Sequence, residues 1–424
     1  MALPAEAADR ALTLPVAARR ARLAVSAAFA AQGLSYALVL NSLPVLESRH
    51  GVGTAQVTLV ILGVCVLAAG GTVLADRLAA SAVGSRGGLV AGLTVLGATL
   101  VGISAAPSFT VLVAAFLGYG LGLGLVDASV NMQAVAVQHR YGRSLLAGFH
   151  GAWSGGGIAG ALLVAALAGR WPVHPLVVVI LLGVPVAAAA AVLVRRTGWW
   201  SGGAAVALPA GDAGAADDGP GGPGPATGGA LVRVPWRPVL LLGLVVVAFY
   251  IVDSAVSAWS ALFLAHDIGA PARVQPLGYA AYLGTTLVSR MVGDLAVRRV
   301  GRVAVVRFGA VLGTLGLLLV MVSSAPWPVV LGFALVGLGL GVVPPMSFSA
   351  AGDVAPGHAD AVVARLNYFN YVGVVLGGVA VGAVGSLATL RAGFLVPAVL
   401  VLTVVLVARV LGTPAGTGTQ EPPR

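Results

Sequence analysis

Asp127 is a carboxylate in a stretch of the sequence that is otherwise uncharged and long enough to cross a lipid bilayer. The stretch reads LGYGLGLGLVDASVNMQAVAV. A carboxylate near the middle of a spanning helix costs about 2.5–3.5 kcal/mol on insertion scales, so it usually lies on a proton, ion or substrate pathway. Asn131 follows at i+4 and shares its helix face. We predict that Asp127 exchanges protons and that Asn131 binds substrate; the alternative is an Asp that only hydrogen-bonds to a neighbouring helix.

Other polar residues within hydrophobic runs are candidates for the same pathway. Asp253, in FYIVDSAVSAWSALFLAHD, is a second intramembrane acid with a possible gating or proton-relay role. His150, in FHGAW, follows a short hairpin after the helix of Asp127 and could partner that carboxylate or bind substrate. Each of these side chains could instead be a packing residue. The remaining candidates for substrate binding are Gln32, Tyr36, Trp153 and Asn370.

The composition is that of a polytopic membrane protein. The chain has 424 residues, of which 58% are hydrophobic and only 9% are charged, whereas a soluble domain is nearer 25% charged. The net charge of +10 comes from Arg residues in the short segments between hydrophobic runs, which does not suggest nucleic-acid binding. Cys65 is the only cysteine, so an internal disulfide is impossible. The sequence has no Walker motif and no cluster with metal-ligand spacing, and we expect no cofactor and no metal.

Twelve hydrophobic runs of about 20 residues predict twelve spanning helices. They cover residues 22–46, 56–75, 87–106, 109–137, 144–167, 174–194, 238–264, 275–293, 303–323, 327–350, 364–384 and 391–411. If both termini are cytoplasmic, 19 of the 24 basic residues fall on the cytoplasmic side, as the positive-inside rule expects. Arg290 lies at the edge of the eighth helix and could pair with an acid or an anionic substrate, but its neighbours favour a place in a cytoplasmic charge loop. The outer loops then hold Arg49, Arg170, Arg273 and Arg391.

The two halves of the chain resemble each other. GLGLGLVDASV (120–130) aligns with GLGLGVVPPMS (337–347) at an offset of 217, and SLLAGFHGAWSGGGIAG (144–160) aligns with ARLNYFNYVGVVLGGVA (364–380) at an offset of 220. Near-equal offsets indicate a duplicated six-helix unit, which is transporter architecture. We expect a cytoplasmic tail (1–21), an N-terminal six-helix bundle (22–196), a flexible linker (197–237), a C-terminal bundle (238–411) and a second tail (412–424).

Twelve helices, a central linker and a 6+6 repeat resemble the major facilitator superfamily over essentially the whole chain. The hairpin from LVDASVNMQ to GFHGAWSGGGIAGA and the segment YFNYVGVVLGG look like those of a bacterial subgroup related to the fucose–proton symporter, including the YbjJ-like transporters. The resemblance implies an all-α fold of two pseudo-symmetric six-helix bundles and an acidic proton-coupling residue at the place of Asp127. The sequence departs from this subgroup in its first helix. The fucose-symporter type has an acidic residue there, and this chain has Leu40 in that position.

VLADRL and SRMVGDLAVRRVGR resemble the two copies of the superfamily's cytoplasmic loop motif. By that resemblance these loops form charge pairs that hold the cytoplasmic side closed; the alternative is that their charges only set topology. The implied gating residues are Asp76, Arg77, Arg86, Asp294, Arg298 and Arg302.

We therefore predict a monomeric, multi-pass secondary transporter of the cell membrane, with both termini cytoplasmic, that moves a small organic solute by alternating access. We expect protons, the solute and the lipid bilayer as its partners. Import of a sugar-like solute and proton-driven export of drug-like or amphipathic metabolites remain open, because the polar set favours the first and the missing acid favours the second. A membrane sensor lacks a soluble output domain in this sequence, and an enzyme lacks a convergent catalytic cluster.

Overall fold

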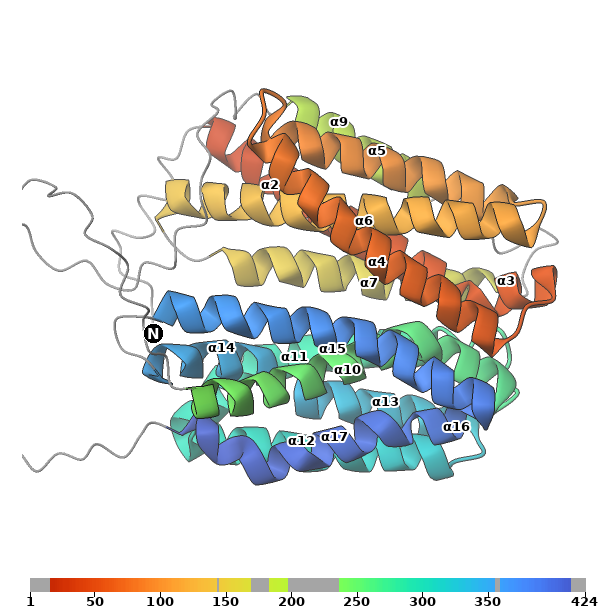
Figure 1. Ribbon diagram of the computed structural model, residues 1–424, viewed down its shortest axis with the longest axis vertical. Coiled ribbons are helices and arrows are strands. Elements are labelled where there is room, and N and C mark those ends of the chain that lie inside the picture. The colour runs from red at the N-terminus through yellow and green to blue at the C-terminus, as the bar shows by residue number, and fades with distance from the viewer. Residues whose placement is uncertain (1–15, 143–144, 169–182, 197–235, 355–358, 413–424) are drawn as a thin grey trace, which may run out of the picture.

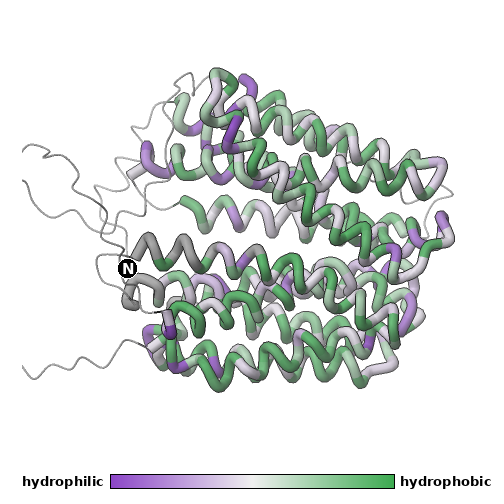
Figure 2. The backbone as a smooth tube through the Cα atoms, viewed as in Figure 1, coloured by the Kyte–Doolittle hydropathy of each residue, from purple (hydrophilic) through white to green (hydrophobic). Residues whose placement is uncertain are grey.

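The computed structural model describes residues 16–142, 145–168, 183–196, 236–354 and 359–412, and its regular structure there is helical. The predicted linker (197–237) lies almost wholly outside these residues, as do the C-terminal tail and most of the N-terminal one. Ten of the described helices are long and apolar enough to cross a membrane. Figure 2 shows the hydrophobic residues along the length of the helices and the hydrophilic residues gathered mainly toward their ends.

The N-terminal half contains seven described helices (Figure 1). They are α2 (Val16–Asn41), α3 (Leu43–His50), α4 (Thr54–Ala79), α5 (Gly84–Ala105), α6 (Phe109–Tyr141), α7 (Leu146–Leu167) and α9 (Val184–Arg196).

The C-terminal half lies beside it and runs from green to blue in Figure 1. It contains α10 (Trp236–His266), α11 (Leu277–Val300), α12 (Arg302–Val322), α13 (Pro326–Leu340), α14 (Val343–Val354), α15 (Ala359–Leu387), α16 (Leu390–Gly393), α17 (Leu395–Val407) and the short 3-10 helix η2 (Ala408–Leu411).

The helices agree closely with the predicted runs, with two kinds of difference. α2 begins at Val16, so the last part of the predicted tail 1–21 is helical; Ala18 and Ala21 are buried there, and alanine is the best helix former. The first predicted helix is also divided, because α3 starts anew with Pro44 in its first turn. Proline lacks the N–H that a continuous helix needs and is tolerated in a first turn. The tenth predicted helix is likewise divided into α13 and α14, and the twelfth into α16, α17 and η2. The first part of the sixth predicted helix (174–182) lies outside the described residues.

Four helix pairs join the halves among the described residues: α4 packs on α15, α7 on α11, and both α2 and α3 on α10. In Figure 1, α4 crosses its own half obliquely and approaches α15 at the end of the molecule where α3 lies. The inner faces of α2, α7, α10 and α11 therefore meet along the boundary between the halves, and side chains on these faces are placed to contact a solute.

Glycine allows α2 and α7 to approach closely within the N-terminal half. A Cβ atom added to Gly156 of α7 would overlap the backbone of Ala30 in α2, and one added to Gly33 of α2 would overlap the backbone of Trp153 in α7. Small residues at such crossings let membrane helices pack backbone to backbone. Gly155, the neighbour of Gly156, faces open space instead.

We expect Gly156→Ala to lower the melting temperature of the protein in detergent, while Gly155→Ala leaves it unchanged or raises it slightly. The new methyl group at 156 meets backbone that cannot turn aside, and overpacking of this kind costs about 1–3 kcal/mol. At 155 the same methyl group meets nothing, and alanine favours the helix. Thermal unfolding of the two variants side by side tests this, and equal melting temperatures would contradict the close α2–α7 approach.

Candidate functional site

Tyr36 and Ser257 mark the middle of the boundary between the halves. The Tyr36 hydroxyl of α2 lies 3.2 Å from the Ser257 hydroxyl of α10. Ser257 also donates to the backbone oxygen of Ser254 one turn earlier. A second polar contact between described residues of the two halves joins Glu47 and His266. Polar side chains near Tyr36 are thus the candidates for a central site.

Asp127 lies near the middle of α6, and its side chain is exposed although the residues around it are apolar. The Gln32 amide of α2 donates to the Asp127 carboxylate with an Nε2–Oδ1 distance of 3.4 Å. Gln32 is only 3% exposed, and its other amide atom, Oε1, is buried without a partner among the described residues. The Asn131 amide donates to the backbone oxygen of Asp127 at 2.8 Å. The Asp127 carboxylate is therefore accessible, and it accepts a hydrogen bond from the side-chain amide of Gln32.

His150 and Trp153 lie one turn apart on α7 and carry an aromatic surface toward α2. The His150 ring meets Phe29 edge-on, with centroids 5.3 Å apart, and its side chain is exposed. The Trp153 ring is 6.0 Å from that of Tyr36. The structure gives Asp127 a contact with Gln32, so the predicted pairing of His150 with Asp127 stays a prediction. Asn370, the pseudo-repeat counterpart of His150, is half-buried on α15.

Asp253 is half-buried in α10 and accepts a hydrogen bond from the Tyr282 hydroxyl of α11 at 2.7 Å. Tyr282 is fully buried. Hydrogen bonds to an ionised acceptor are stronger than neutral ones. Asp253 and Asp127 are thus two acids near the middle of their helices, one in each half, and each has a single polar partner from a neighbouring helix.

Arg290 is the central residue that the sequence did not assign to the site. It lies well inside α11, is half-buried, and donates from Nε to the backbone oxygen of Gly341 at 3.3 Å. It is close enough to His150 and to Asp253 to act on both electrostatically. Arg290 therefore lies within α11 rather than in the loop that follows it, and its charge acts on both the acid and the histidine. The sequence placed Arg290 three residues before the expected end of this helix, at residue 293, so its position well inside α11 was not predicted.

Two of the predicted gating residues, Arg86 and Arg302, contact residues of their own halves. Arg86 donates to the backbone oxygen of Arg195 at 2.6 Å, and Arg302 donates to Ser349 at 3.3 Å. Asp76, Arg77 and Arg298 are exposed, and the side chain of Asp294 is outside the described residues. Their role in closing the cytoplasmic side stays a prediction.

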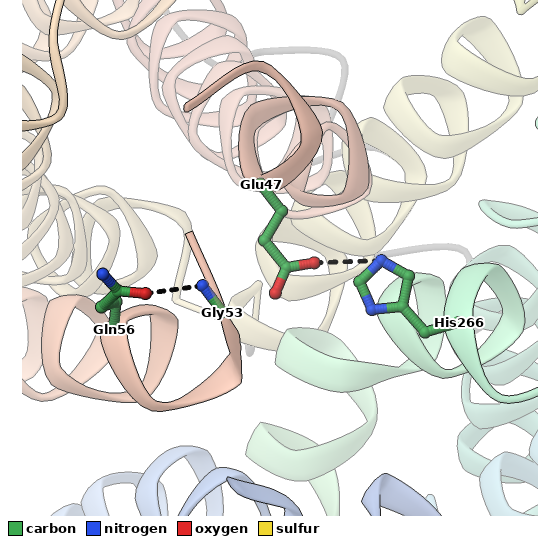
Figure 3. Close-up of polar contacts among 4 residues, drawn as sticks. All are labelled: Glu47, Gly53, Gln56 and His266. Carbon is green, nitrogen blue, oxygen red and sulfur yellow. Dashed lines mark hydrogen bonds and ion pairs between the residues drawn. The ribbon is translucent and has the colours of Figure 1, made fainter. Parts of the chain in front are cut away.

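Glu47 and His266 join the halves at the opposite end (Figure 3). Glu47 Oε2 lies 3.1 Å from His266 Nε2; Glu47 is 4% exposed and His266 48%. Burial raises the pKa of the Glu47 carboxyl to about 7. The same view shows how α4 begins, where the Gly53 N–H donates to Gln56 Oε1 at 2.6 Å. Nothing in the sequence linked Glu47 to His266, since each lies at the end of a different hydrophobic run.

Comparisons with known proteins agree with this architecture. The family model for the Major Facilitator Superfamily matches residues 241–424. An uncharacterized MFS-type transporter of Yersinia pestis is 28% identical over 297 residues, which cover 70% of this chain and 71% of that protein. The membrane protein MosC of Rhizobium meliloti is 23% identical over 367 residues, 86% of this chain and 83% of that protein.

Solved structures give the same fold. The nucleoside transporter NupG aligns with a TM-score of 0.67 at 12% identity, covering 92% of this chain and 98% of its own. A bacterial homolog of the human lysosomal transporter Spinster aligns with a TM-score of 0.67 at 13% identity, covering 94% and 98%. FucP aligns with a TM-score of 0.57 at 13% identity, covering 93% and 99%. The predicted major facilitator fold is confirmed, and the comparisons point to a transporter and not an enzyme; the likeness to the fucose-symporter subgroup stays a prediction.

Proposed function

We propose that this chain, a multi-pass membrane transporter with the major facilitator fold, is a secondary active transporter that couples a small organic solute to protons. It would work in the cytoplasmic membrane by alternating access, with both termini in the cytoplasm and as a monomer. The observation that carries this proposal is Asp127: an exposed carboxylate in the middle of a spanning helix, facing the buried amide of Gln32.

Gln32 suits a partner that gains and loses a proton. An amide donates through its nitrogen to a carboxylate and accepts through its oxygen from a protonated acid. The unpartnered Oε1 of Gln32 is available for the second arrangement. An uncharged acid is easier to enclose in an apolar environment than a carboxylate. The halves can therefore close over Asp127 more readily once it carries a proton, which links protonation to the alternation of access.

Asp253 is the second proton site in this mechanism. Its bond from Tyr282 ties α10 to α11, so a change in its charge acts on the packing of the C-terminal half. Asn131, His150, Trp153 and Asn370 supply polar and aromatic surface for the solute, and Gln32 and Tyr36 complete it from α2.

The gates follow from the contacts between the halves. Glu47 and His266, which contact each other across the two halves, would close the outer end. The charge loops that begin at Asp76 and at Asp294 would close the cytoplasmic end in the alternate state. In this assignment one end of the protein is closed while the other is open, as alternating access requires.

Proton-driven export of amphipathic solutes is the second candidate. The aromatic rings of Phe29, Tyr36 and Trp153 along α2 and α7 favour it, whereas the amides of Gln32 and Asn131 favour a solute that forms hydrogen bonds.

The test is transport by the purified protein in liposomes with an imposed pH gradient. We expect a solute to accumulate against its own gradient and to stop doing so when a protonophore collapses the pH gradient. Accumulation that survives the protonophore would refute proton coupling, and the direction of the effect would separate import from export.

A further inference from the structure

We propose that the boundary between the halves binds a small organic anion, a solute with a carboxylate or phosphate group, through the guanidinium of Arg290. The inference rests on the proposed transport function and names a substrate class for it.

The guanidinium of Arg290 has donors to spare. Arginine presents five N–H donors, and the hydrogen bond of Arg290 within the described residues uses only Nε, toward Gly341. Among the side chains that the structure describes, which do not include that of Asp294, no carboxylate oxygen lies within 4.0 Å of this guanidinium. The remaining four N–H groups form the edge that pairs with two oxygens of a carboxylate or phosphate. A half-buried cation with an unused fork inside a spanning helix is costly, and an anionic solute would satisfy it.

Asp253 does not form an ion pair with the terminal nitrogens of Arg290. Its Oδ1 accepts from the Tyr282 hydroxyl, and it acts on Arg290 electrostatically without an ion pair. The acid therefore lessens the cost of holding the arginine in the membrane but leaves its terminal nitrogens open. A solute anion and Asp253 would compete for the same positive charge, so protonation of Asp253 would strengthen anion binding.

The opposite half supplies a second contact for the same anion. His150 is exposed on α7 and lies within electrostatic range of Arg290. An anion held by both would bridge α7 and α11, one of the helix pairs that join the halves. A ligand shifts a conformational equilibrium only by binding its states unequally, and a bridge between the moving halves has this property. Trp153, one turn further along α7, offers its ring to the rest of the solute.

The test measures thermal stabilisation of the purified full-length protein by probe pairs that differ in charge. The pairs are 4-hydroxybenzoate with 4-hydroxybenzamide and glucuronate with glucose, together with inorganic phosphate. We expect at least one anion to raise the melting temperature and its neutral partner to have no effect. Arg290→Gln should weaken that binding about 10- to 100-fold, the loss expected for a charge-assisted hydrogen bond, and Arg290→Lys should weaken it less.

Arg307→Gln is the matched control. Arg307 is also half-buried and also donates from Nε to a backbone oxygen, that of Val405 at 3.2 Å, but on α12. We expect this variant to bind the anion as the wild type does. A double variant, Asp253→Asn with Arg290→Gln, should keep its fold and still fail to bind the anion; restored binding would mean that Arg290 serves only as a counter-charge for Asp253.

The proposal is overturned if no anion raises the melting temperature, if only neutral probes do, or if Arg290→Gln binds the anion as tightly as the wild type. Its failure is distinguishable from failure of proton coupling. A neutral solute that accumulates with protons in liposomes would leave the transport proposal standing and refute this one. If an anion binds through Arg290 but its accumulation does not depend on a pH gradient, the anion-binding proposal stands and proton coupling is refuted.

Discussion

Asp127→Asn should abolish proton-driven accumulation and leave the protein folded. With one proton per solute, a gradient of about one pH unit supports about tenfold accumulation, since each tenfold ratio corresponds to 1.4 kcal/mol. We expect the wild type to approach that ratio and the variant to stop at equal concentrations on both sides. The reason is that asparagine keeps the shape of the side chain and a bond with Gln32 but cannot carry a proton between the two sides.

Solute exchange is the measurement that separates coupling from binding. In liposomes loaded with unlabelled solute and given no pH gradient, the variant should still exchange labelled solute, because exchange needs only the alternation of the loaded carrier. The melting temperature should be unchanged or higher, since an intramembrane charge has been removed. Asp217→Asn, in the predicted linker, is the matched control and should accumulate solute as the wild type does. Undiminished accumulation by Asp127→Asn would remove this acid from the mechanism.

The helices were predictable because the bilayer imposes their length and composition. The runs 109–137 and 238–264 became α6 (Phe109–Tyr141) and α10 (Trp236–His266), each a few residues longer than predicted. The extensions are polar or charged turns that continue the helix beyond the apolar core, and hydropathy does not detect them. The repeat offsets predicted two bundles, and the structure arranges the helices as two halves, of which the N-terminal one contacts the other through α2, α3, α4 and α7.

The site was predictable in part. Asp127 and Asp253 stood out as acids in apolar surroundings, which is a property of one segment of sequence. Their partners did not, because Gln32 and Tyr282 reach them from other helices through packing that a single segment does not encode. Arg290 was assigned to a charge loop because the Arg residues near 298–302 follow it. The helix continues to Val300, and ten residues of helix at 1.5 Å each separate it from that end by about 15 Å.

Raising the pH through about 7 should open the outer end of the protein. Burial raises the pKa of Glu47 from 4.5 to about 7, so the closed outer end binds a proton more tightly than an end in which Glu47 faces water. Protonation of Glu47 therefore favours closure: the stabilisation is complete below about pH 4.5 and is lost as the pH rises through 7. The shift corresponds to about 3 kcal/mol at most, enough to change the ratio of closed to open molecules about 100-fold.

Other titratable groups at this end act on the same equilibrium. His266 faces Glu47 directly, and the pKa of His50, on the helix of Glu47, is lowered by burial and by Arg49. The pKa of Asp267 is raised by burial, against the opposing effects of Arg391 and His266. A Glu47→Gln variant isolates the contribution of Glu47, because it keeps the size of the side chain and mimics the protonated acid.

The distance between labels on the two halves measures the opening. Ser48 and Ala272 are exposed close in sequence to Glu47 and His266, and spin labels on cysteines at these positions, in a Cys65→Ala background, would report the opening by pulsed electron resonance. We expect the wild type to shift toward longer distances between pH 6 and 8 and Glu47→Gln to stay short throughout. Glu6→Gln, outside the described residues, should behave as the wild type.

The sign of the Glu47→Gln effect distinguishes two accounts of the contact. If Glu47 is held as a neutral acid beside His266, glutamine replaces it without loss and the outer end stays closed at high pH. If the contact works as an ion pair between a carboxylate and an imidazolium, glutamine removes the attraction and the outer end opens at every pH. The wild type would then be most closed at intermediate pH, because acid neutralises the carboxylate and base neutralises the imidazolium. The burial of Glu47 and the exposure of His266 favour the neutral acid, because a nearly inaccessible carboxylate beside a hydrated imidazolium loses more in desolvation than the pair regains.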